Sequence, residues 1–247
     1  MAQYKFREML LTPGRGGRPG RKITPKALVI HWTANLSRGA DATANRNYFE
    51  NHPENKVSAH YIVDDHQVVQ CIPEDEMAYH VGAKVYRKRA LQELGSYPNN
   101  CTIGIETCVN ADGDFKKTYQ NLVELTASIL KRHGWGTDRL WRHFDVTGKD
   151  CPKFFVTDAT AKSYGFPGAT AGWEKFKRDV SIELKAREVL SMFRDVTKNH
   201  WAASSIERLA QLGIIKGDAQ GNFRPEDPIT RAEVAALLDR ILKLLGK

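Results

Sequence analysis

Apolar and polar positions in the first 182 residues follow two periods, one typical of strands and one typical of helices. Residues 27–32 (ALVIHW) form a continuously apolar run that contains His31, which is typical of a strand buried on both faces. Residues 101–107 alternate instead, with isoleucines on one face and Gly104 and Glu106 on the other. Both segments are predicted strands.

Helical periodicity is clearest at residues 114–133, where an apolar stripe is followed by Gly134, a residue that favours helix termination. Residues 42–51 follow an aspartate that suits the cap position and form a second predicted helix. Residues 57–63 and 67–72 flank a polar turn and predict a hairpin. Strands alternating with helices predict a mixed α/β domain with a central β-sheet flanked by helices.

The same pattern continues through a short predicted strand at 140–144 and a last amphipathic helix, so the α/β domain is expected to cover residues 1–182. The charged segment 183–192 is a predicted helical linker. Residues 193–247 are predicted to form a separate, small all-α module.

The C-terminal module is predicted to contain two helices around a turn-rich loop. The first helix is expected to bury Trp201 and Leu212 and to stop at Gly213. Thr230 is expected to cap the second helix. The unit occurs once in the sequence.

Charge and composition narrow the choice of partners. The chain carries 37 Lys and Arg against 29 Asp and Glu, a net charge of +8, which favours a polyanionic partner. The densest basic run, residues 15–22, is rich in glycine and has no interleaved aromatic residues, so nucleic acid is not expected. No apolar run approaches the roughly 18 residues that a membrane helix needs, and the N-terminus lacks the features of a signal peptide. We therefore expect synthesis in the cytosol and no membrane insertion.

The chain has four cysteines: Cys71, Cys101, Cys108 and Cys151. Cys101 and Cys108 bracket one predicted strand, where seven steps separate them by roughly 23 Å. A disulfide needs Cα atoms within about 7 Å, so these two cannot pair within that strand. Free thiols or metal ligands are the expected states.

Residues 142–152 (RHFDVTGKDCP) place His143 and Cys151 eight positions apart, and both side chains are zinc ligands in other proteins. His31, at the end of a predicted central strand, is the best third candidate because sites in α/β sheets form at that edge. From spacing alone, structural roles for these histidines are slightly favoured over metal binding.

Lys149 favours a catalytic metal site over a structural role for this segment. An ammonium group beside zinc is suited to stabilising an oxyanion rather than to binding the metal. Glu106 is a candidate general base that accepts a proton from zinc-activated water. The alternative for Glu106 is an ordinary salt-bridge partner.

Five segments, ALVIHWTAN, VSAHYIVDD, AYHVG, IGIETCVN and RHFDVTGKDCP, occur in the order found in zinc-dependent N-acetylmuramoyl-L-alanine amidases of the phage lysozyme and peptidoglycan-recognition superfamily. The chain resembles this family over residues 26–182. The resemblance implies the amidase-2 fold, one Zn²⁺ per catalytic domain, the metal ligands His31, His143 and Cys151, and the catalytic residues Glu106 and Lys149.

The resemblance also implies contacts with substrate for His80, in AYHVG, and for His60. The alternative for His80 is a surface histidine. Some phage members carry a catalytic tyrosine just before the histidine of the second segment, where this chain has Ala59. The chemistry is therefore expected to depend on Glu106, and Tyr61 is expected to lie in the core.

The C-terminal module resembles a surface-layer homology (SLH) module through FRDV, HWA, IERLAQLGII and GNFRPEDPITRAE. That family binds anionic secondary cell-wall polymers, usually with three modules. The resemblance implies polymer-binding roles for Trp201, Arg224, Thr230, Arg231 and Glu233. With one copy, the chain either forms a homo-oligomer or binds weakly; a stabilising helical cap is the alternative.

Together these resemblances imply a peptidoglycan hydrolase that cleaves the amide bond between N-acetylmuramic acid and L-alanine with zinc-activated water. A phage endolysin, held in the host cytoplasm until holin-dependent release to the cell wall of a Gram-positive host, is the leading expectation. The alternatives are a host autolysin, a non-catalytic peptidoglycan-binding protein and a domain that zinc stabilises structurally.

Overall fold

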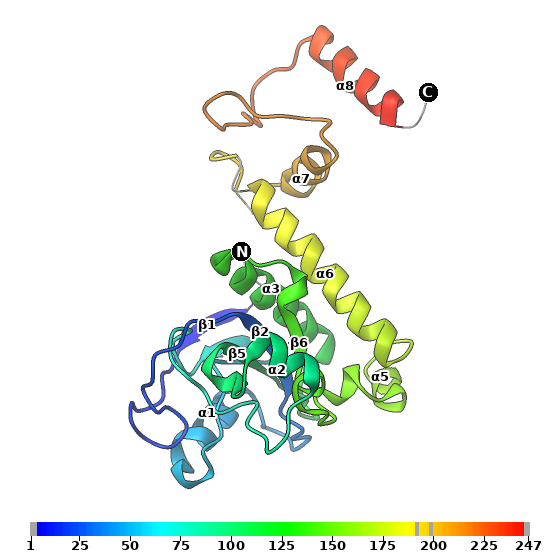
Figure 1. The fold of residues 1–247 in the computed structure, drawn as a ribbon. Helices are drawn as coiled ribbons and strands as arrows, with labels where there is room; N and C mark the ends of the chain where they lie inside the picture. The colour runs from blue at the N-terminus through cyan, green and yellow to red at the C-terminus, as the bar shows by residue number, and fades with distance from the viewer. Residues whose placement is uncertain (1–3, 191–192, 198–199, 245–247) are drawn as a thin grey trace. The chain divides into compact units, whose positions relative to one another are not determined.

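The computed structural model of the protein describes residues 4–190, 193–197 and 200–244 (Figure 1). The chain divides into two compact units, one formed by residues 2–181 and the other by residues 182–247. Each unit is described by itself below.

The first unit is built on one six-stranded sheet with helices around it. Its strands are β1 (Lys5–Glu8), β2 (Ala27–Trp32), β3 (Tyr61–Val63), β4 (Gln67–Gln70), β5 (Thr102–Thr107) and β6 (Leu140–Arg142). Its α-helices are α1 (Ala42–Asn51), α2 (Lys88–Leu94), α3 (Phe115–His133), α4 (His143–Thr147), α5 (Asp158–Ser163) and most of α6 (Ala169–Leu190). Four single-turn 3-10 helices join them: η1 (Pro53–Asn55), η2 (Pro98–Asn100), η3 (Thr137–Arg139) and η4 (Lys153–Phe155).

The strand order is β1-β4-β3-β5-β2-β6. Only β3 and β4 pair antiparallel, as the predicted hairpin, and the other pairs are parallel. The sheet is therefore mixed, with β5 and β2 next to each other inside it. This confirms the predicted mixed α/β architecture.

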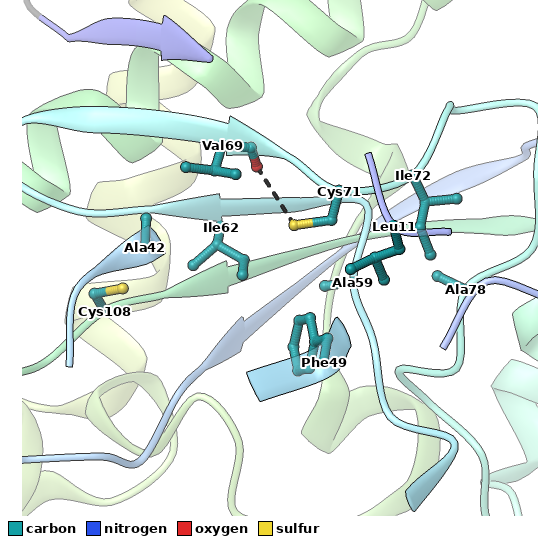
Figure 2. Packing of buried hydrophobic residues seen from close by; sticks show 10 residues of the cluster. All are labelled: Leu11, Ala42, Phe49, Ala59, Ile62, Val69, Cys71, Ile72, Ala78 and Cys108. Carbon is teal, nitrogen blue, oxygen red and sulfur yellow. Dashed lines mark hydrogen bonds between the residues drawn. The ribbon is translucent and has the colours of Figure 1, made fainter. Parts of the chain in front are cut away.

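An apolar cluster under α1 fixes one face of the hairpin. Phe49 of α1 packs with Ile62 of β3 and Val69 of β4, all of them buried (Figure 2). The full cluster is Leu11, Ala42, Phe49, Ala59, Ile62, Val69, Cys71, Ile72, Ala78 and Cys108. Because side chains alternate along a strand, Tyr61 faces the other way. It is buried as expected, and its hydroxyl donates to Glu74 at 2.8 Å.

The predicted elements agree closely with the structure at β2, α1 and α3. Asp41 caps α1 by accepting from the Ala44 amide at 2.7 Å, and Gly134 ends α3 in the left-handed conformation. The predicted strand at 140–144 was too long. The Asp145 carboxylate accepts the Arg142 amide at 2.9 Å, so the backbone turns and His143 begins α4.

The linker helix predicted at 183–192 is not a separate element over its described part. Residues 183–190 continue α6, and residues 191–192 lie outside the described residues. The reason is visible in the sequence, because no glycine or proline interrupts residues 173–190.

The second unit contains α7 (Ala203–Gln211) and α8 (Arg231–Leu244) around a small apolar cluster. Its buried members are Phe193, Val196, Ala203, Ile206, Ile214 and Ile215. Thr230 caps α8 as predicted: its hydroxyl accepts from the Glu233 amide at 3.2 Å, and the Glu233 carboxylate accepts from the Thr230 amide at 2.8 Å.

The expected burial of Trp201 was wrong. Its side chain is 86% exposed because it lies before α7 begins, where its ring stacks on His200 rather than on the cluster. Leu212, just after α7, is also exposed. Among the described helices, none combines the length and the apolar character needed to span a membrane.

Candidate metal centre

Three side chains meet at the carboxyl edge of the sheet, where β2 ends and α4 begins. The Nδ1 atom of His31 lies 3.1 Å from Nδ1 of His143 and 3.7 Å from Sγ of Cys151. All three residues are buried, and their candidate ligand atoms lie within 4.8 Å of one another. The structure therefore brings together the three predicted metal ligands.

The loop after α4 is folded back so that Cys151 reaches the cluster. Gly148 ends α4 with φ 88°, a left-handed conformation that favours glycine. The carbonyl of Cys151 accepts from the Phe144 amide at 2.8 Å, and the Cys151 amide donates to the Lys149 carbonyl at 2.7 Å. These backbone bonds place the two ends of the RHFDVTGKDCP segment against each other.

The donor set matches what a zinc ion prefers. In a tetrahedral site, two nitrogens at about 2.0–2.1 Å from zinc lie about 3.3 Å apart, and a nitrogen and a sulfur lie about 3.6 Å apart. The observed separations of 3.1 and 3.7 Å are close to these values. Two imidazoles and one thiol leave a fourth position for water or substrate, as catalytic zinc sites do.

Burial sets the protonation of the cluster. It holds the pKa of His31 well below its usual range and lowers that of His143 to about 4, with Lys149 adding to both effects. Both imidazoles are therefore neutral at pH 7, the form that binds metal. Burial raises the pKa of Cys151 to about 12, so its thiolate forms only when a cation is bound.

Glu106 stands beside this cluster. It is the register partner of His31 on the neighbouring parallel strand, so both side chains leave the same face of the sheet. Its Oε2 atom is buried and has no hydrogen-bond partner in the part of the chain that the structure describes. Burial raises the pKa of Glu106 to about 8, against the opposing effect of the Lys149 ammonium. Such a carboxylate is poised to exchange a proton near neutral pH.

Lys149 shares one groove with Glu106 and the three candidate ligands. The groove has a volume of about 680 Å³, and Lys149 is an exposed residue on its wall. Its remaining lining residues, apart from His80, were not assigned a role from the sequence: Trp32, Thr33, Ala34, Asn45, Tyr48, Phe49, Lys56, Val57, Tyr79, His80, Gly82, Tyr97 and Asn99. Sequence reasoning missed these residues, apart from His80, because only the fold brings them together.

His60 is not among the residues that line this groove and lies behind His80, with the two ring centroids 5.7 Å apart. Its side chain is fully buried, its Nδ1 accepts from the Gly104 amide at 3.0 Å, and its Nε2 lies 2.8 Å from the Glu76 carbonyl. Both ring nitrogens are thus satisfied inside the protein, and none is free for a substrate. We do not retain His60 as a substrate contact.

His80 is not a surface histidine. It is 8% exposed on the groove wall, and its Nδ1 atom lies 3.0 Å from Nε2 of His31. Its principal contact in the structure is therefore a candidate metal ligand.

Two of the five predicted polymer-binding residues line one groove. Arg224 and Glu233 line a groove of about 570 Å³ in the second unit, whereas Trp201, Thr230 and Arg231 are not among its lining residues. The Arg224 guanidinium is engaged by Asp218 at 2.8 Å. Asp195 belongs to the FRDV segment but had no assigned role; its carboxylate accepts the amides of residues 223 and 224 and holds this loop.

A mixed α/β domain with a two-histidine, one-cysteine centre and a carboxylate at its sheet edge defines the class of single-metal hydrolytic domains. The profile of the family described as N-acetylmuramoyl-L-alanine amidase matches residues 20–154, more than half of the chain. The chain belongs to this family. A second profile, that of the S-layer homology domain, matches residues 193–235.

Individual relatives agree with this assignment. The chain is 40% identical over 147 residues to a probable N-acetylmuramoyl-L-alanine amidase of Bacillus licheniformis, covering 58% of this chain and 40% of that protein. The chain thus spans less than half the length of this relative. The chain is also 42% identical over 52 residues to the S-layer protein sap of Bacillus anthracis, covering 21% of this chain and 6% of that protein.

Solved structures extend the likeness to the fold. The catalytic domain of XlyA is 30% identical and superposes with a TM-score of 0.57, covering 71% of this chain and 99% of that one. A mutant endolysin from Bacillus subtilis is also 30% identical, with a TM-score of 0.58, covering 72% of this chain and 99% of that one.

Proposed function

We propose that this protein hydrolyses the amide bond between N-acetylmuramic acid and L-alanine in peptidoglycan, with a zinc ion held by His31, His143 and Cys151. The observation that carries the proposal is the unpaired, buried Oε2 of Glu106 on the same sheet face as the metal cluster. Membership of the amidase family supports the choice of bond.

When bound, zinc supplies Lewis acidity that makes a water molecule a nucleophile near neutral pH. Glu106 accepts the proton of that water at its carboxylate and passes it to the nitrogen of the departing alanine. Lys149, an exposed cation on the groove wall, donates a hydrogen bond to the oxyanion that develops on the lactyl carbonyl. The bond from the carbonyl carbon to nitrogen breaks, and the products are a free lactyl carboxylate and an alanine amine.

Digestion of purified Gram-positive cell walls with the full chain tests this function. We expect new N-terminal alanine amines, detected by amine labelling and Edman chemistry, and no new reducing sugar ends. New reducing ends would identify a glycosidase and refute the proposal. Binding to walls without release of amines would identify a non-catalytic peptidoglycan-binding protein instead.

We further propose that the protein acts as an endolysin, a role supported by its likeness to the Bacillus subtilis endolysin structure. In that role it is held in the host cytoplasm until holin lesions give it access to the wall. Expression in a Gram-positive host is expected to leave cells intact until the membrane is permeabilised. Lysis or wall turnover without permeabilisation would favour a host autolysin.

The S-layer homology domain associates the chain with the cell wall. We propose that it binds an anionic secondary wall polymer through Trp201, Arg224, Thr230, Arg231 and Glu233. The exposed Arg231 at the start of α8 suits an anionic carboxylate, and Thr230 and Glu233 hold the backbone there. Replacing Arg231 with alanine is expected to weaken sedimentation with purified wall polymer, and unchanged sedimentation would refute this role.

Self-association of this single module is a related proposal. Apolar side chains of α8 and its flanks are exposed over the described residues: Ile229, Val234, Leu238, Leu242 and Leu244. Docking of a second copy on this face would remove these apolar side chains from water and so favour association. Sedimentation velocity is expected to show a dimer or larger species that Leu238→Glu dissociates, and a monomer at all concentrations would contradict it.

A further inference from the structure

We infer that His80 is a positioning residue of the metal centre: it fixes the tautomer and the ring orientation of the ligand His31 through a hydrogen-bonded chain that ends at Thr102. The inference rests on the proposed zinc site. It replaces the substrate contact that the sequence suggested for His80.

The two ring nitrogens of His31 face different partners. Nδ1 faces the other candidate ligands, 3.1 Å from Nδ1 of His143 and 3.7 Å from Sγ of Cys151. Nε2 points the other way and lies 3.0 Å from Nδ1 of His80. A nitrogen that ligates a metal carries no proton, so the proton of His31 resides on Nε2 and is donated to His80.

The same logic continues one step outward. His80 accepts at Nδ1, so its own proton is on Nε2, which lies 3.2 Å from the Thr102 carbonyl and 3.1 Å from the Thr102 hydroxyl. That hydroxyl donates its proton to the Pro98 carbonyl at 2.8 Å and therefore offers lone pairs to His80. Backbone carbonyls terminate the chain, so ligation of a metal by Nδ1 of His31 would fix every proton position in it.

The His80 ring is held where only glycine leaves room for it. A Cβ added at Gly104 would lie 2.6 Å from Cγ and 2.7 Å from Nδ1 of His80, closer than real Cβ contacts occur. The backbone of His80 is fixed too, because its amide donates to Asn99 at 3.2 Å. The ring meets His31 edge-on, at 87° with centroids 5.1 Å apart. The absence of a side chain at Gly104 is thus part of the support for the metal ligand.

The group that accepts the second N–H of His31 is an imidazole, that of His80. A zinc-bound histidine commonly donates its second N–H to a carboxylate, a backbone carbonyl or water. A neutral imidazole orients the ring equally well but adds no negative charge to the centre. The charge at the metal is then balanced by the Cys151 thiolate alone among the three candidate ligands.

Zinc affinity of the full chain, measured by competition with a chromophoric chelator, tests the inference without reference to catalysis. His80→Phe keeps a flat ring but has no acceptor, and we expect zinc to bind about 10–100-fold more weakly. His80→Asn presents a carbonyl oxygen near the position of Nδ1 and is expected to restore most of the affinity. Gly104→Ala, which displaces the ring without touching its chemistry, is expected to weaken binding as His80→Phe does.

Two further measurements separate positioning from loss of structure. The visible spectrum of the cobalt-substituted protein is expected to change in His80→Phe and Gly104→Ala but not in His80→Asn. Long-range ¹H–¹⁵N spectra of the zinc-loaded protein are expected to show His80 protonated on Nε2. Wild-type zinc affinity and cobalt spectrum in His80→Phe, or a proton on Nδ1 of His80, would overturn the inference.

The outcomes also distinguish this inference from the proposed function. If the wild-type protein binds zinc but releases no alanine amines, the proposed function is refuted while the inference about His80 still stands. Should His80→Phe fail to fold, the comparison of His80→Asn with Gly104→Ala decides. The inference is supported if zinc binds more weakly to Gly104→Ala than to His80→Asn. It is contradicted if the two variants bind zinc with the same affinity.

Discussion

His31 and Glu106 are register partners on adjacent parallel strands, so the sheet itself sets the separation between a candidate metal ligand and the candidate proton acceptor. A slip of one residue between β2 and β5 would turn one of the two side chains to the opposite face. The buried residues on both strands hold the register in place. Strand pairing therefore sets the relation between His31 and Glu106, whereas the loop after α4 places Lys149 and Cys151.

Replacing Glu106 with glutamine tests its role as the proton acceptor. The amide has the same shape but cannot accept a proton at neutral pH, so kcat is expected to fall by about 10²–10⁴-fold while bound zinc stays at one per chain. Amine release from cell walls and metal analysis measure the two quantities. Glu93→Gln, on the exposed surface of α2, is the matched control. A rate within a few-fold of wild type would remove Glu106 from the mechanism.

The metal assignment predicts that Cys151→Ser loses zinc and amidase activity together. A hydroxyl is a far weaker zinc ligand than a thiolate, and only two ligands would remain. The control is Cys71→Ala, which changes a buried thiol in the apolar cluster under α1 and is expected to retain both properties. Dialysis against a chelator should reproduce the loss in the wild type, and added zinc should reverse it. Full turnover by Cys151→Ser would refute the ligand set.

Lys149 is predicted to act after the metal has bound. Lys149→Met keeps much of the side-chain length but removes the charge, and we expect kcat to fall by about 10²–10³-fold with zinc content unchanged. Lys162→Met, an exposed lysine in α5, serves as the control for lost charge. If Lys149→Met changed KM alone, the lysine would bind substrate without stabilising the transition state.

Buried neutral histidines predict that the metal-free protein loses stability in mild acid. Burial lowers the pKa of His60 to about 4, against 6.5 for an ordinary histidine. Below pH 6.5 His60 is protonated in the unfolded chain but stays neutral in the folded protein. The contribution of His60 to folded-state stability is therefore complete above pH 6.5 and is lost between pH 6.5 and about 4. This contribution amounts to roughly 3 kcal/mol of unfolding free energy.

Urea unfolding of the zinc-free protein across that pH range measures this effect. His60→Gln keeps a donor for the Glu76 carbonyl and has no titrating group. It is expected to be less stable than wild type at pH 7 but to show a flatter decline toward pH 4. Parallel curves for the two proteins would show that His60 does not titrate on unfolding.

Much of the fold follows from local sequence patterns. The apolar run of β2, the Asp41 cap of α1 and the stop at Gly134 are short-range signals, and the structure confirms each one. The three candidate ligands were also identifiable. Residues 142–152 contain His143 and Cys151, and His31 stands near the end of a predicted central strand. Each of these sequence patterns involves only a few neighbouring residues, so it can be recognised without knowing how the chain packs.

Other features required the tertiary structure. The exposure of Trp201 depends on where α7 begins, and aromatic character alone could not reveal it. His80 and His60 lie in similar apolar sequence contexts, yet one contacts a candidate ligand and the other is tied to Gly104 and Glu76. Such hydrogen bonds join residues many positions apart, and no spacing rule in the sequence encodes them.

The two outer strands of the sheet have a consequence for association between chains. An open sheet edge can pair with another molecule and seed aggregation, and long, flat, apolar edges are the most dangerous. Here β1 is four exposed residues, KFRE, with charges at three of its positions, and β6 is three residues long and passes directly into a helix. Neither edge is a long, flat, apolar template, so extension of the sheet by a second copy is disfavoured at both ends.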